Sequence, residues 1–155
     1  MAVASNVKKY TIRHIKEAAG TEVEIPVYPT STVPSDNLVS KSWNNMYGVF
    51  KDIPVNLKAK VNWIFDCISE DDLETLYGDM IRAKIVQYKS RFFVVNTHFP
   101  GVGFITGTFY LGTPTNFKSL GGQNNNGEVN WYSGEIHWIE VDGIKLNDPT
   151  ILTIP

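Results

Sequence analysis

The sequence is poor in cysteine, because Cys67 is the only one among its 155 residues. A lone cysteine excludes a disulfide within the chain and any metal site built from several cysteines. It is typical of a protein made in a reducing cytoplasm. Cys67 follows the apolar residues Ile64 and Phe65, and this setting predicts a buried, unreactive thiol.

Long apolar runs are also missing. The first ten residues are polar and contain Lys8 and Lys9, so they lack the apolar core of a secretory signal peptide. No stretch approaches the roughly 18 apolar residues that a membrane span requires. We therefore expect a soluble protein with no membrane partner.

The sequence also lacks an excess of basic residues. The chain has 14 Lys and Arg residues against 16 Asp and Glu residues, which gives a formal net charge of −2. The two signs are interspersed, so no basic stripe is present to neutralise a phosphate backbone. Nucleic acid is therefore not expected as the primary ligand.

Motifs of catalysis, cofactor binding and metal binding are absent as well. The three histidines, His14, His98 and His137, are far apart and lack the spacing of metal ligands. Glu135 and Glu140 have opposite parity on one predicted strand, so they form no glycosidase-like pair. No nucleophile elbow, P-loop or dinucleotide fingerprint occurs. We predict no enzyme activity, no cofactor and no metal site.

What the sequence does contain is strict two-residue alternation over residues 55–63. The apolar residues share one face of an extended strand. The polar residues share the other face: Asn56, Lys58, Lys60 and Asn62. One face is therefore expected to pack in a core, while the polar face meets water or a partner.

One helix is predicted over about residues 70–82. Ser69 is suited to cap it, Asp72 completes a capping-box pattern, and the acidic residues of the first turn suit the helix dipole. An apolar stripe then recurs at helical spacing: Leu73, Leu76, Tyr77, Met80 and Ile81. We expect this stripe to face a sheet.

Further strands are predicted over residues 8–15, 84–89, 91–99, 104–111, 128–141 and 144–146. Ser133 and Gly134 indicate a bulge or bend, and Asp142 and Gly143 indicate a hairpin turn. Strands and helices do not alternate, so the sheet is expected to be antiparallel. The predicted fold class is α+β, mainly β: an antiparallel β-sandwich or a partly closed barrel with one flanking helix.

The domain organisation follows from the chain length and from the prolines. A chain of 155 residues is expected to form a single domain. Pro26, Pro29 and Pro34 favour extended chain without central-strand pairing. We therefore divide the chain into an N-terminal strand with a Pro-rich arm, residues 1–40, and a core with the helix, residues 41–155.

A first aromatic group lies just after the Pro-rich arm. It consists of Trp43, Met46, Tyr47 and Phe50. These side chains either cover the core or form a contact surface for another subunit, since aromatic residues and Met are enriched at such surfaces.

A second aromatic group lies on the later strands and consists of Tyr110, Trp131, Tyr132 and Trp138. One face of a sandwich strand must be apolar in any case, so core packing is one interpretation of these residues. The other is a stacking platform for sugar rings, as in a glycan-binding or receptor-binding module.

The order of these parts carries a family resemblance over about residues 38–143. The matching parts are the alternating strand, the helix sequence SEDDLETL at 69–76, the strands RFFVV at 91–95 and TGTFYLG at 106–112, and the strand at 131–140. This order resembles that of small tail proteins of long-tailed bacteriophages, which have a tail-tube or distal-tail fold.

The resemblance implies a structural virion protein of a phage tail, placed in the tube, the distal tail or the baseplate. Its copies would join into a ring, usually sixfold, and bind other tail proteins. DNA would be only a passing cargo in the channel of the ring. The polar strand face would then line the channel, and the stacking of rings would use loops and the aromatic segment from Trp43 to Phe50. Such a protein is made in the host cytoplasm and ends up in the virion tail.

Overall fold

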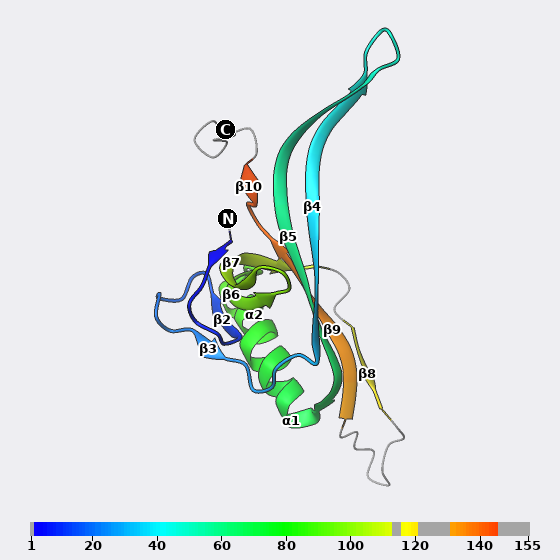
Figure 1. Ribbon diagram of the computed structural model, residues 1–155. Helices are drawn as coiled ribbons and strands as arrows, with labels where there is room; N and C mark the ends of the chain where they lie inside the picture. The colour runs from blue at the N-terminus through cyan, green and yellow to red at the C-terminus, as the bar shows by residue number, and fades with distance from the viewer. Residues whose placement is uncertain (1, 113–115, 121–130, 146–155) are drawn as a thin grey trace.

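The computed structural model describes residues 2–112, 116–120 and 131–145 (Figure 1). Side chains are described for all of these except residues 36–41, 52–56 and 144–145. The described residues form ten strands and one helical segment, which lies against one side of the sheet (Figure 1). The strands are β1 (Val3–Ala4), β2 (Thr11–His14), β3 (Val23–Glu24), β4 (Ser31–Asn44), β5 (Phe50–Ser69), β6 (Phe92–Phe99), β7 (Gly103–Leu111), β8 (Asn116–Ser119), β9 (Trp131–Glu140) and β10 (Ile144–Lys145). The helical segment consists of α1 (Glu70–Leu73), η1 (Glu74–Arg82) and α2 (Ala83–Tyr88).

All ten strands belong to one antiparallel sheet, whose main path is β10-β5-β9-β7-β6-β2-β3. The sheet curls over its own core, because Trp63 on β5 reaches Thr97 on β6 although two strands lie between them in the sheet order. Within the described residues no pairing joins the ends of this path, so the sheet does not close into a barrel. The predicted class, α+β and mainly β, is confirmed.

The long hairpin of β4 and β5 projects away from the rest of the molecule (Figure 1). β4 pairs with β5 from Ser31 to Asn44, with one irregularity after Val39. β4 runs through residues 40 and 41, between which we divided the chain, and it belongs to the same sheet as the core. Pro34 is tolerated because β4 pairs on one side only among the described strands.

The sheet forks at β9. The first half of β9 pairs with β8, and its last three residues pair with β7. Gly134 lies where β8 passes: a Cβ there would lie within 2.8 Å of Phe117 Cα. A bulge or bend was predicted at Ser133 and Gly134 of β9. The register does shift there, but the extra residue lies in the paired strand, between Phe65 and Ile68 of β5.

The predicted hairpin turn at Asp142 and Gly143 is wrong. β9 pairs with β5 from Lys60 onward, and β10 pairs with the same strand at Asn56 and Leu57. The two strands therefore follow one line along β5, with a kink between them where Gly143 has a φ of 68°. A hairpin would have placed β10 beside β9.

The helix begins as predicted and ends later. The Ser69 hydroxyl accepts a hydrogen bond from the Asp72 N–H at 3.3 Å. The π-helical segment η1 continues into α2, so the helix runs to Tyr88, and the predicted strand over residues 84–89 is wrong. The left-handed backbone of Lys89, with a φ of 52°, ends it. No helix in the described part of the chain has the length and apolar character to cross a membrane.

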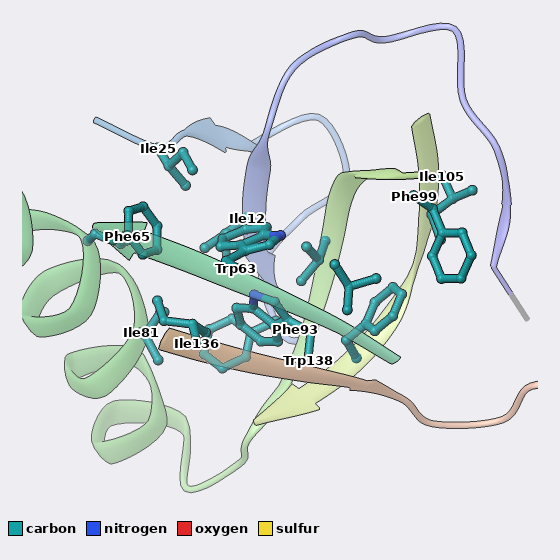
Figure 2. Packing of buried hydrophobic residues seen from close by; sticks show 14 of the residues in the cluster. Ile12, Ile25, Trp63, Phe65, Ile81, Phe93, Phe99, Ile105, Ile136 and Trp138 are labelled. Carbon is teal, nitrogen blue, oxygen red and sulfur yellow. The ribbon is translucent and has the colours of Figure 1, made fainter. Parts of the chain in front are cut away.

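The core lies between the curled sheet and the helix (Figure 2). Trp63 and Trp138 meet edge to face near its centre, with ring centroids 5.5 Å apart. Leu76 and Ile81 are the fully buried residues that the helix contributes. Cys67 is exposed, so its predicted burial is wrong: it lies in the irregular stretch of β5, outside the inward alternation.

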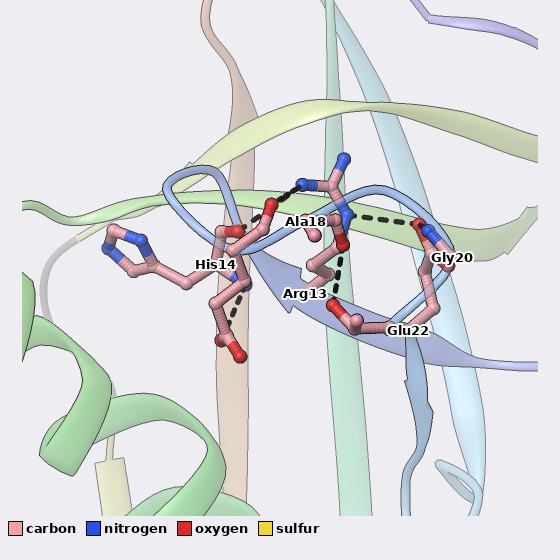
Figure 3. A network of polar contacts seen from close by, with 7 residues as sticks. Arg13, His14, Ala18, Gly20 and Glu22 are labelled. Atoms are coloured by element: carbon pink, nitrogen blue, oxygen red, sulfur yellow. Dashed lines mark hydrogen bonds and ion pairs between the residues drawn. The ribbon is translucent and has the colours of Figure 1, made fainter.

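Two polar networks hold the N-terminal part in place. The side-chain amide of Asn96 donates to the Val7 and Lys9 carbonyls at 2.7 and 2.6 Å. Arg13 near the end of β2 pairs with Glu22 at 3.0 Å and donates to the Glu17 carbonyl at 2.6 Å, both in the loop that leads to β3 (Figure 3). These contacts tie residues 2–24 to the sheet and shape that loop.

Candidate functional site

The outer face of a four-stranded layer, β4-β5-β9-β8, carries the predicted polar strand face. Lys58, Lys60 and Asn62 are half-buried on this face, and the side chain of Asn56 lies outside the described residues. The opposite face of the same strands contributes Val61, Trp63 and Trp138 to the core. The alternation in the sequence therefore predicted correctly which side of β5 packs.

His137, Glu135 and Asn62 meet on this outer face. Nδ1 of His137 lies 2.7 Å from the Asn62 side-chain oxygen, and Nε2 lies 3.2 Å from a Glu135 carboxylate oxygen. Through these two contacts the imidazole links β9 to Asn62 on β5. Sequence reasoning missed this pairing, because it depends on the register between two strands far apart in the chain.

Among the described strands, both edges of this layer are open. β4 has β5 as its partner and β8 has β9, and no other described strand pairs with either. An edge strand presents unpaired backbone N–H and C=O groups that another chain can bind. The polar face thus belongs to a layer that can be extended on both sides.

The first aromatic group lies at the hairpin tip, which we define as Trp43, Met46, Tyr47, Val49 and Phe50, all of them exposed. Met46 and Tyr47 are 89% and 83% exposed. The interpretation of these residues as a cover for the core is therefore wrong: they lie at the far end of the β4–β5 hairpin (Figure 1). A contact surface remains a proposal.

Asn45 gives the hairpin tip a defined shape. Its side-chain oxygen accepts hydrogen bonds from the N–H groups of Tyr47 and Val49 at 2.9 and 3.0 Å. Its carbonyl accepts from Gly48, whose φ of 76° suits glycine. The exposed side chains are thus presented on an ordered turn.

The second aromatic group does not gather into a platform. Trp138 is fully buried in the core, whereas Trp131 is 51% exposed at the other end of β9. Tyr132 donates to Glu70 at 3.0 Å, and Tyr110 lies under the Arg91 guanidinium. A sugar-stacking surface that includes Trp138 is therefore ruled out, because a sugar ring cannot reach this buried side chain.

A groove of about 700 Å³ lies where β8 and β9 meet the irregular stretch of β5. We name it the β8–β9 groove. It is lined by Ile64, Asp66, Asn116, Phe117, Lys118, Ser133, Gly134 and Glu135. Sequence reasoning did not find it, although Gly134 within a strand was a signal for close backbone approach.

The described histidines and carboxylates do not gather into a metal site. No group of three or more His, Cys, Asp or Glu residues in the described part of the chain is placed to hold a metal ion. His14 is buried: its Nδ1 accepts from the Lys16 N–H at 3.1 Å, so its Nε2 donates to the Ser90 carbonyl at 3.0 Å. Glu140 is buried too, and it accepts hydrogen bonds from the N–H groups of Ala2 and Ala59.

Several ionisable groups titrate away from their ordinary range. Burial raises the pKa of Tyr10, and a hydrogen bond from Thr32 partly offsets this. Hydrogen bonds to Glu24 and Glu70 raise the pKa values of Tyr28 and Tyr132, respectively. The pKa of Glu22 is lowered, first by its own backbone N–H and then by Gly20 and Arg13. None of these groups lies on the polar outer face or at the hairpin tip.

Comparison with known proteins gives a structural similarity and no sequence match. No protein-family model and no curated protein matches the chain. The chain is similar to one in the solved virion of a native gene transfer agent particle, with a TM-score of 0.44 and 16% identity. The match covers 92% of this chain and 98% of the other.

Proposed function

We propose that the protein is a structural virion component of a phage tail or tail-like particle, whose copies form a ring around a DNA channel. The observation that carries this proposal is the β4-β5-β9-β8 layer, which combines a polar outer face with open edges on both sides. The role is structural and uses no catalytic group. Tube, distal tail and baseplate are positions in which such a ring would serve.

The strand directions in the layer suit a ring. Each neighbouring pair within it is antiparallel, so β4 and β8 run in opposite directions. When copies follow one another around an axis, β8 of one copy therefore meets β4 of the next in an antiparallel sense. Joining the layers in this way closes the open edges and turns the outer faces toward one axis.

The charges on the outer face suit a passing polyanion. Lys58 and Lys60 are balanced on the same face by Glu135, and His137 is engaged with Glu135 and Asn62. A strongly basic lining would bind phosphates and hold the DNA. A mixed lining lets DNA pass through with weak contact. The sixfold count implied by the family resemblance is part of the proposal.

The experiment is a concentration series of the purified protein by multi-angle light scattering, with negative-stain imaging. We expect closed rings or short tubes. A monomer at every concentration, or only irregular aggregates, would contradict the proposal.

A matched pair of variants tests the edge contact. Pro34 lies in β4 opposite Val61, and proline is tolerated where its nitrogen faces away from the partner strand. Asp36, two residues on, then directs its N–H to the open edge, while the N–H of Ser35 faces β5. Asp36→Pro is expected to abolish rings and keep the fold, whereas Ser35→Pro disrupts the hairpin itself. Rings formed as readily by Asp36→Pro would exclude β4 as the joining edge.

A further inference from the structure

A separate groove lies on the side of the molecule that faces away from the polar outer face. β5 and β6 face each other across the core through Trp63 and Thr97, so the outer faces of these two strands point in opposite directions. The outer face of β2, β6 and β7 forms the floor of this groove. One wall is the N-terminal strap, which we define as residues 2–9, and the other is the loop between β2 and β3. We name it the strap groove.

The strand register places a polar row on the floor of the strap groove. Thr11 of β2 lies beside Asn96 of β6, which lies beside Thr106 of β7. The Asn96 amide donates to two carbonyls of the strap, and its oxygen accepts from the Thr106 hydroxyl. The Thr11 hydroxyl forms no hydrogen bond with any described residue, although it lines the same groove. It is therefore available to a ligand.

Glu22 is the one charged side chain among the described residues that line the groove. A glutamate is ionised at neutral pH, so the groove presents a negative charge. Arg13 bonds this carboxylate through Oε1 at 3.0 Å. The same guanidinium donates to the Glu17 carbonyl at 2.6 Å, which holds it toward the loop. The carboxylate therefore keeps acceptor capacity for a second cation.

Val7 and Val94 place apolar surface beside this charge. The volume of the groove, about 380 Å³, lies near the lower end of the range of roughly 300–1,000 Å³ that is typical of small-molecule sites. No aromatic side chain is among the described lining residues, so a sugar ring finds no stacking partner there. A short alkyl chain that ends in a cation matches this lining better than a sugar or an anion does.

We propose that the strap groove binds a primary alkylammonium ion, a small free amine of the size of n-butylammonium. The ammonium group donates to the Glu22 carboxylate and the Thr11 hydroxyl, and the alkyl chain lies against Val7 and Val94. A lysine side chain carries the same chemistry, but its backbone would have to fit between the strap and the loop. The site faces away from the proposed channel, so it does not depend on the proposed function.

Saturation-transfer difference NMR of n-butylammonium tests the proposal, because this method observes the ligand and works on monomers and rings alike. We expect saturable transfer from the wild type and none to n-butanol, which has the same chain without the charge. Glu22→Gln is expected to weaken binding about tenfold, since it removes a charged acceptor. Glu24→Gln is the matched control: this carboxylate, two residues on, bonds the Tyr28 hydroxyl and does not line the groove, so its loss is expected to leave the affinity unchanged.

A second variant leaves the Glu22 and Arg13 pair intact. Val94→Trp fills the floor of the groove and is expected to abolish binding, with circular dichroism to verify the fold. Several results would overturn the proposal: no saturable transfer, equal transfer to n-butanol, full affinity in Glu22→Gln or Val94→Trp, or an equal loss in Glu24→Gln. Tighter binding of Nα-acetyl-lysine methylamide than of n-butylammonium would also overturn it, by assigning the groove to a lysine of a partner protein.

Discussion

Trp63 is the residue that joins the two sides of the curled sheet. Its indole N–H donates to the Thr97 hydroxyl at 2.8 Å, and both side chains are fully buried. Its ring also contacts Tyr10 and Trp138 edge to face. Because water cannot replace a partner at this depth, the hydrogen bond fixes how β5 lies over β6.

Thr97→Val is therefore expected to lower the free energy of unfolding by about 1–3 kcal/mol, since it leaves the buried Trp63 N–H without an acceptor. Denaturant unfolding followed by tryptophan fluorescence measures this. Thr97→Ser keeps the hydroxyl and is expected to lose less. A Val variant as stable as the wild type would show that the bond contributes nothing.

The raised pKa of Tyr10 makes stability depend on alkaline pH. The folded-state pKa lies above the ordinary tyrosine value of 10.0 because of burial, so the unfolded chain loses its proton first as the pH rises. The stabilising contribution is complete below pH 10.0 and is lost as the pH rises through the folded-state pKa. Unfolding curves across this range are expected to show a smaller loss for Tyr10→Phe than for the wild type. An equal loss in both proteins would contradict the assignment to Tyr10.

At the scale of the elements, the sequence predicted those features that depend on local residue patterns. The alternation over residues 55–63 identified the buried side of β5, and Ser69 with Asp72 identified the helix start. The helix end was missed because the β-branched residues Ile85 and Val86 favour strand, yet their segment continues the helix. The packing of Leu76 and Ile81 in the same helical segment outweighs that local preference.

β4 was missed for a different reason. Its outer end lies beyond the core, and residues 42–44 there are exposed, so this end needs no apolar alternation. The hairpin tip was found in sequence, because aromatic residues stand out there, but its exposure depends on how far the hairpin projects. The groove could not be predicted, because it depends on the register of three strands.

Two glycine substitutions should act in opposite directions. In Gly134→Ala, the new Cβ meets the backbone of β8, so we expect β8 to be displaced and the free energy of unfolding to fall by about 1–3 kcal/mol. In Gly78→Ala, the new Cβ meets only Glu74 Cγ at 3.8 Å, and the helix gains about 1 kcal/mol. Thermal unfolding of both variants measures the difference. Equal shifts for the two would mean that β8 does not press on Gly134.

At the scale of the whole molecule, stability and association reside in different parts. The core and helix hold the fold, while the hairpin tip is remote from both. Met46→Ser with Tyr47→Ser is therefore expected to change the free energy of unfolding by less than about 0.5 kcal/mol. The same variant is expected to weaken self-association in sedimentation velocity, whereas Val86→Ser is expected to leave it unchanged. Loss of the fold in the tip variant would contradict this separation.

The N-terminal segment has a consequence for how the chain matures during synthesis. Residues 2–9 leave the ribosome early, yet their partners are Asn96, Phe104, Thr106 and Glu140. This segment must wait, undocked, until most of the chain has been translated, because contacts of such sequence separation form late. The same holds for β5, which is complete long before β9 arrives to cover its edge. A nascent chain thus carries unpaired strand edges through most of translation. Premature pairing of these edges with those of nascent chains on neighbouring ribosomes would cause aggregation.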